Sequence, residues 1–125
     1  MEASEFLNFK NWAVAGDITN PEKYAHRIFK SLEKAGFKAY GVNPRANNDN
    51  VYKSLKDISQ KVDVVDLCIS PKIGIDIIKQ AHDIGIKYIL IQPGAESDNI
   101  LSYCEDKGII GIEGCALVEL SKYNK

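Results

Sequence analysis

Hydrophobic and polar residues follow two patterns along this chain. Short apolar runs end in Gly, Pro or Asn, and between them lie longer stretches in which apolar residues recur every three or four positions. The first pattern is typical of buried β-strands and the second of amphipathic helices. We predict strands at about 12–15, 37–42, 63–69, 87–91 and 109–112. We predict helices at about 21–35, 71–84 and 97–107, with shorter helical turns within 1–11, 51–58 and 116–120.

Strands and helices therefore alternate, which favours parallel strands joined by right-handed crossovers. We expect residues 1–125 to form a single α/β domain with a Rossmann-like, doubly wound, five-stranded parallel sheet. Helices on both faces of the sheet would give three layers, αβα. With strands numbered along the chain, the predicted order is 3-2-1-4-5. A ligand would bind outside the carboxyl ends of the strands at the switch point between strands one and four.

The loops at that edge would be 16–20, 43–45, 70–71 and 92–95. The first of them follows a buried strand and turns at Gly16. Asn20 is a good helix N-cap, and Pro21 suits the first helical position. The free N–H groups at such a helix start attract phosphate.

A dinucleotide site of the usual kind is disfavoured. Ile18 and Pro21 stand where the fingerprint G-x-G-x-x-G would place its second and third glycines. The second strand ends at Asn43, whereas NAD sites use an acidic residue there for the ribose hydroxyls.

Several short motifs, taken in order, resemble one family. They are Val14-Ala15-Gly16, Asn20-Pro21-Glu22-Lys23-Tyr24 with Arg27, Val42-Asn43-Pro44, Tyr52 with Ser54-Leu55, Val62-Asp63-Val64-Val65-Asp66, and Ile91-Gln92-Pro93-Gly94-Ala95-Glu96-Ser97. From about Phe9 to Leu120 the chain resembles the small CoA-binding domain family, which is similar to the CoA-binding domain of the succinyl-CoA synthetase alpha subunit.

The resemblance implies that CoA or acyl-CoA is the bound ligand and lies across the switch point. Its phosphates would approach Gly16 and accept hydrogen bonds from the backbone that follows. The adenosine end would lie near Arg45, Ile69 would belong to an apolar wall, and the pantetheine arm would pass Pro93. The expected ligand-binding residues are Gly16, Asp17, Ile18, Thr19, Asn20, Lys23, Arg27, Asn43, Pro44, Arg45, Ile69, Ser70, Pro71, Gln92, Pro93 and Gly94.

The chain departs from the family pattern at the phosphate loop. Asp17-Ile18 stands where the family usually has Ala-Ser, so a carboxylate enters a site meant for phosphate. Anion binding should weaken unless Asp17 points away or pairs with Lys23 or Arg27. Arg27 would either face the ligand phosphates or hold Asp17 or Asp66. Ala25 replaces a frequent glycine, and its methyl group would limit how closely strand and helix approach.

No nucleophile–base pair, metal-ligand cluster or acid pair stands out, so we expect no catalytic and no metal-binding residues. His26 and His82 fall within predicted helices, and we interpret them as half-exposed helix residues. Asp66 lies in a buried strand, where a structural ion pair is the favoured interpretation. Cys115 is interpreted as an inert, buried thiol.

Composition and charge narrow the possible binding partners and the expected cellular compartment. The 125 residues carry a net charge of -1, which disfavours a nucleic-acid-binding face. The acidic start lacks the apolar region of a signal peptide, and no apolar stretch approaches the length of a membrane span. Three widely spaced cysteines suit the reducing cytoplasm.

We therefore interpret the sequence as a non-catalytic CoA or acyl-CoA binding protein in the cytoplasm, with a small nucleotide ligand as its partner. Two alternatives stay open. One is a sensing module for NAD(H) or an adenine nucleotide. The other is an accessory subunit of an NDP-forming acyl-CoA synthetase, so either a homodimer or a synthetase partner is compatible with the sequence.

Overall fold

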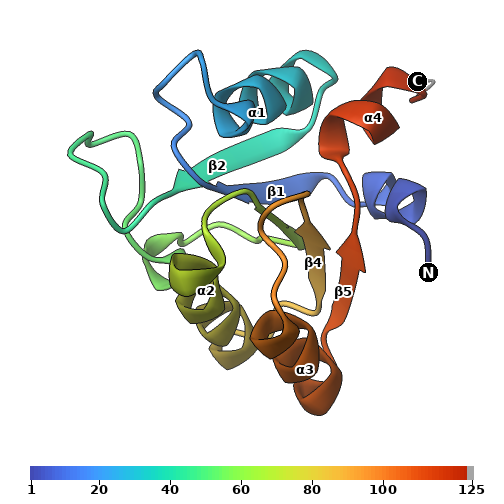
Figure 1. Cartoon of the computed structure of the whole chain (residues 1–125). Helices are drawn as coiled ribbons and strands as arrows, with labels where there is room; N and C mark the ends of the chain where they lie inside the picture. The colour runs from blue at the N-terminus through green and yellow to red at the C-terminus, as the bar shows by residue number, and fades with distance from the viewer. Residues whose placement is uncertain (124–125) are drawn as a thin grey trace.

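The computed structural model describes residues 1–123 and contains one five-stranded parallel sheet covered by helices on both faces (Figure 1). The strands are β1 (Asn11–Ala15), β2 (Lys38–Val42), β3 (Val64–Leu67), β4 (Tyr88–Ile91) and β5 (Ile110–Glu113). The α-helices are α1 (Tyr24–Lys34), α2 (Pro71–Asp83), α3 (Asp98–Lys107) and α4 (Ala116–Ser121), and the 3₁₀ helices are η1 (Ala3–Asn8) and η2 (Leu55–Asp57). The predicted Rossmann-like α/β fold is confirmed.

Two apolar clusters separate the three layers. On one face, η1, α1 and α4 pack against the sheet around Phe6, Trp12 and Ile28. On the other face, η2, α2 and α3 pack around Leu55, Ile77 and other aliphatic side chains. None of the helices in residues 1–123 is long and apolar enough to cross a membrane.

The predicted strand order 3-2-1-4-5 is wrong, because the observed order is β2-β1-β3-β4-β5. β3 pairs with β1, placing Asp66 opposite Val14, and it does not pair with β2. The connection from β2 to β3 includes η2, which packs on the α2 side of the sheet, whereas α1 covers the opposite side. The switch point therefore lies between β1 and β3, where α1 and α2 leave on opposite faces.

Burial explains this order. All four residues of β3 are buried, whereas β2 is exposed at Lys38 and only half-buried at Ala39 and Tyr40. A continuous apolar run is typical of a strand with neighbours on both edges and helices on both faces. The outer edge of β2 is partly covered by Tyr52, whose N–H donates to the carbonyl of Gly41 at 2.9 Å. The fully buried β3 thus lies inside the sheet, and the partly exposed β2 lies at its edge.

The predicted C-terminal ends of three helices are confirmed, whereas the predicted N-terminal end of α1 is wrong. The glycines predicted to end three helices, Gly36, Gly85 and Gly108, have φ of 93°, 84° and 72°, the left-handed conformation that suits glycine. Asn20, however, is not the N-cap of α1. Its side chain accepts from the N–H of Glu22 and its carbonyl from the N–H of Lys23, so a turn precedes the helix and Lys23 becomes the N-cap.

Asp66 is fully buried and, among residues 1–123, has no ion-pair partner, so the predicted structural ion pair is absent. Its Oδ1 accepts a short hydrogen bond from Nε2 of Gln92, and its Oδ2 has no partner among these residues. Its neighbours across the sheet are the apolar Val14 and Leu90. Burial raises the pKa of Asp66 to about 7, against the opposing effect of the Gln92 hydrogen bond.

This burial predicts a pH-dependent stability. The pKa of folded Asp66, about 7, lies above its ordinary value of 3.8, so folding retains a proton that the unfolded chain releases. The contribution of this group to stability is therefore full at low pH and falls as the pH rises from about 4 to about 7. Asparagine cannot ionise, so its contribution does not change with pH. The free energy of unfolding of Asp66→Asn, relative to that of the wild type, should therefore rise by about 2–3 kcal/mol when the pH is raised from 5 to 8.

Urea denaturation of both proteins at the two pH values measures this difference. The exposed Asp76 of α2 supplies a matched control, and Asp76→Asn should track the wild type. If the stability difference between Asp66→Asn and wild type is the same at both pH values, the buried carboxyl does not behave as described.

Candidate functional site

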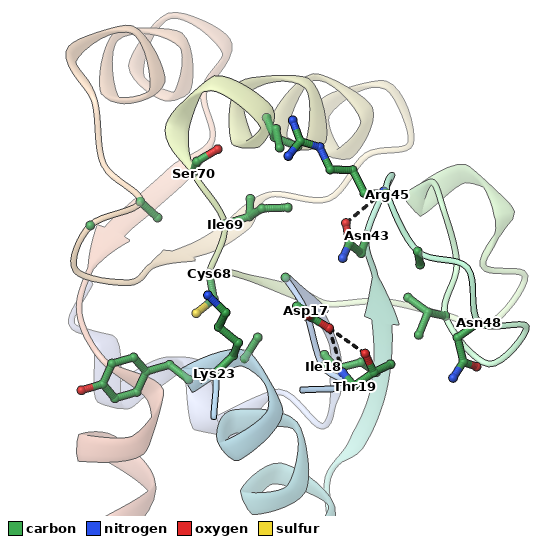
Figure 2. Close-up of a pocket in the computed structure, with 18 of the residues that line it drawn as sticks. Asp17, Ile18, Thr19, Lys23, Asn43, Arg45, Asn48, Cys68, Ile69 and Ser70 are labelled. Carbon is green, nitrogen blue, oxygen red and sulfur yellow. Dashed lines mark hydrogen bonds between the residues drawn. The ribbon is translucent and has the colours of Figure 1, made fainter. Parts of the chain in front are cut away.

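A cavity of about 870 Å³ opens at the carboxyl ends of the strands, above the β1–β3 switch point (Figure 2). Eleven residues expected from the sequence line it: Gly16, Asp17, Ile18, Thr19, Lys23, Asn43, Arg45, Ile69, Ser70, Pro93 and Gly94. Nine further lining residues were not predicted from the sequence: Tyr24, Ala25, Ala46, Asn47, Asn48, Val51, Cys68, Ile73 and Ala95.

Five expected residues do not line the cavity: Asn20, Arg27, Pro44, Pro71 and Gln92. The exposed Arg27 guanidinium lies 5.3 Å from the centre of the Tyr24 ring. Among residues 1–123 it pairs with neither Asp17 nor Asp66. Gln92 instead points into the core, where its amide donates to Asp66.

Gly16 lines the cavity and directly follows the last residue of β1. A Cβ on this residue would lie 2.4 Å from the Cys68 carbonyl oxygen and 2.8 Å from the Cβ of Ala25. Hydrogen bonds fix the same corner, because the N–H of Gly16 donates to Val42 and that of Cys68 to Ala15. The end of β3 and the start of α1 can meet here because position 16 has no side chain. Ala25 therefore does not prevent the close approach of strand and helix.

The Asp17 carboxylate is held by its own loop. Its Oδ1 accepts from the Thr19 hydroxyl at 2.7 Å and from the Thr19 N–H at 3.2 Å (Figure 2). Among the described residues, Asp17 pairs with neither Lys23 nor Arg27, the two cations that the sequence suggested. A negative charge consequently stays on the wall of the cavity.

Two cations line the same cavity as this carboxylate. Lys23 extends from the start of α1 and Arg45 from the loop after β2, on the other side of the cavity (Figure 2). Neither forms an ion pair within the part of the chain that the structure describes. The N-cap of α1 also makes no side-chain hydrogen bond to the first turn of the helix. Unpaired cations beside an uncapped helix start favour a bound anion.

The side of the cavity toward α2 is more apolar. Ile69 and Ile73 lie here, and Val51 and Ala95 come from neighbouring loops. Cys68 is half-buried at the end of β3, and its desolvation, followed by the nearby Asp66 carboxylate, raises the pKa of the thiol to about 12. The thiol therefore remains protonated at neutral pH and is a poor nucleophile. Residues 1–123 contain no group of three or more side chains that could hold a metal ion.

The loop from Ala46 to Val51 supplies four of the nine lining residues that were not predicted. Its polar, Asn-rich composition indicated only a loop. The available signal was its position, because a loop that follows β2 must start at the carboxyl edge of the sheet. Cys68 was missed for a similar reason, since it reads as the end of a buried strand.

Fold and site together define a Rossmann-like domain with a cavity at its topological switch point, lined by two cations and one aspartate. The chain belongs to the CoA binding domain family, whose sequence profile matches residues 10–121. It is also 31% identical, over 90 residues, to the alpha subunit of the ADP-forming acetate–CoA ligase II of Pyrococcus furiosus. That match includes 69% of this chain but 20% of the subunit, so the chain spans about a fifth of the length of this curated relative.

Solved structures agree on the fold. A conserved hypothetical protein from Pyrococcus furiosus is 35% identical and has a TM-score of 0.81, covering 89% of this chain and 99% of its own. A hypothetical protein from Pyrococcus horikoshii OT3 is 28% identical with a TM-score of 0.86, covering 94% and 87%. The dinucleotide-forming acetyl-coenzyme A synthetase 1 of Ca. Korarchaeum cryptofilum shares the fold at 22% identity and a TM-score of 0.71, covering 89% of this chain and 27% of that one.

The corner at Gly16 yields a stability prediction. Gly16→Ala places a methyl group against the backbone oxygen of Cys68, which cannot rotate away. We expect the free energy of unfolding to fall by about 2 kcal/mol or more, as for an overpacked core. Urea denaturation measures the loss.

Gly74→Ala, within α2, is the matched control. Its new Cβ would lie 3.2 Å from the end of the flexible Leu67 side chain of β3. Its destabilising contact is offset by a helix propensity about 1 kcal/mol better than that of glycine. Equal stability losses for the two variants would show that Gly16 has no special role.

Proposed function

We propose that this chain binds CoA or acyl-CoA in the cavity above the β1–β3 switch point and does not turn it over. The observation that carries the proposal is the pairing of two unlike surfaces in one cavity. Lys23, Arg45 and the start of α1 offer a site for phosphates, and the side chains of Ile69 and Ile73 offer an apolar wall. CoA combines a phosphorylated nucleotide with a long, weakly polar arm, and membership of the CoA binding domain family supports this ligand.

The expected placement follows the chemistry of the lining. The phosphates would lie between Lys23 and Arg45 and accept from free N–H groups at the start of α1. The adenosine end would lie along the loop from Asn43 to Asn48, and the pantetheine arm would pass Pro93 and Gly94. A cavity of about 870 Å³ falls within the usual range for ligand pockets.

Binding without turnover is supported by the state of the ionisable groups. The Cys68 thiol is kept protonated, because its pKa is raised to about 12. His26 makes a hydrogen bond to the backbone of Ile18, and His82 packs edge-on against Tyr103 away from the cavity. The lining thus offers hydrogen bonds and charge but no general base paired with a nucleophile.

A second candidate role is that of an accessory CoA-binding subunit for a synthetase. The observation in its favour is the 31% identity to one subunit of an ADP-forming acetate–CoA ligase. In that role the cavity would still hold CoA, and the chemistry would belong to a partner chain. An NAD-sensing role is less well supported, because β2 is followed by Asn43, whose Oδ1 already accepts from the N–H of Arg45.

The first functional prediction is a preference for CoA over NAD. Calorimetric titration should show CoA binding at least about tenfold more tightly, a difference of about 1.4 kcal/mol. Lys23→Ala should weaken CoA binding about fivefold, as expected when one solvated phosphate contact is lost. Lys30→Ala is the control, because Lys30 lies on α1 outside the cavity and pairs with Glu33. NAD binding equal to or tighter than CoA binding would contradict the proposal.

The second functional prediction concerns the charge in the phosphate loop. Asp17→Asn keeps an oxygen that can accept from Thr19 but removes the negative charge, so CoA affinity should rise about fivefold, or by about 1 kcal/mol. The gain should shrink at high salt, because screening weakens the repulsion. Asp76→Asn, on the outside of α2, should leave affinity unchanged. Weaker binding by Asp17→Asn would mean that the carboxylate assists the ligand.

A further inference from the structure

His26 is the histidine that touches the cavity loop, although it does not line the cavity itself. It lies half-buried in the first turn of α1, and its Nδ1 is 2.8 Å from the carbonyl oxygen of Ile18. A carbonyl oxygen can only accept, so Nδ1 must carry a proton and donate it to this hydrogen bond. In its neutral form His26 is therefore the Nδ1–H tautomer, with Nε2 unprotonated.

A second contact, with β2, holds Ile18 through its side chain. The Ile18 side chain packs over Gly41 of β2, where a Cβ would lie 2.2 Å from Ile18 Cδ1 and 2.9 Å from Cγ1. The absence of a side chain at Gly41 creates a notch in the sheet that receives Ile18. Ile18 is thus held through its backbone by α1 and through its side chain by β2.

These two contacts fix the orientation of the loop in the cavity. The carbonyl and the N–H of one peptide unit point in opposite directions, so holding the Ile18 oxygen on α1 turns the Thr19 N–H away from the helix. That N–H is the one that meets the Asp17 carboxylate. Thr19 itself is exposed, so packing of its side chain contributes little to this orientation.

We propose that His26 is a positioning residue, which sets the conformation of the loop Gly16–Asn20 before any ligand arrives. For ligand binding, this inference rests on the function proposed above. A loop that is already ordered loses less conformational freedom when a ligand binds, which is why preorganisation raises affinity. His26 acts through the Ile18 carbonyl, and Gly41 acts through the Ile18 side chain.

Two substitutions at His26 separate this role from general packing. His26→Leu removes the donor, whereas His26→Asn places an amide nitrogen where Nδ1 stands. Amide hydrogen exchange of the ligand-free protein should speed up about tenfold over residues 17–20 in His26→Leu and return to near the wild-type rate in His26→Asn. The CoA dissociation constant should rise about fivefold in His26→Leu and stay within about twofold of wild type in His26→Asn.

Matched controls come from α2 and β2. His82→Leu removes the other histidine, which packs against Tyr103, and should change neither loop exchange nor CoA affinity. Should His26→Leu fail to fold, His26→Ala removes the same donor with a smaller side chain and should also speed up exchange over residues 17–20. Gly41→Ala tests the second contact, because its methyl group displaces the Ile18 side chain from the notch.

The outcomes separate this inference from the proposed function. Unchanged loop exchange in His26→Leu, or equally fast exchange in His26→Leu and His26→Asn, would overturn the role of His26. Faster exchange with unchanged CoA affinity would overturn its role in binding while leaving CoA binding intact. If the wild type bound no CoA, the proposed function would fail, and the exchange rates of the ligand-free variants would still decide whether His26 sets the loop.

Discussion

The structure depends on the close approach of backbone to backbone at Gly16. There the end of β1 passes beneath the Cys68 carbonyl and against Ala25, in a space that a single methyl group would fill. This contact brings the end of β3 close to the start of α1. The loops that follow β1 and β3 therefore both begin beside Gly16. The cavity exists because the two crossovers that begin there, through α1 and α2, leave on opposite faces of the sheet.

Much of this architecture was predictable from the sequence. The alternation of apolar runs with three-and-four spacing located every strand and long helix, and the helix stops at Gly36, Gly85 and Gly108 have the left-handed backbone that was expected. The strand order was predicted wrongly, although burial on both faces was visible in the run Val64–Leu67. That nearly continuous apolar run indicates an interior strand, whereas the predicted order 3-2-1-4-5 placed it at the edge of the sheet.

The site was less predictable, because hydrogen bonds that depend on tertiary structure decide it. Asn20 looked like an N-cap, but its side chain closes a turn before α1. Asp17 looked in need of a cation, but Thr19 satisfies it locally. Asp66 looked in need of an ion pair, but it is held by a neutral amide and stays in an apolar row. In each case the residue type indicated a polar partner, and only the fold determined which partner was in reach.

We propose above that CoA occupies the cavity between Lys23 and Arg45 at the β1–β3 edge. The most direct measurement is a titration of ¹⁵N-labelled protein with CoA, followed by two-dimensional NMR. We expect the largest shift changes at residues 16–19, 43–48, 69–70 and 93–95, with little change on α3 or the outer face of α1. Changes concentrated on α3 or β5, or no changes at saturating CoA, would contradict the proposal.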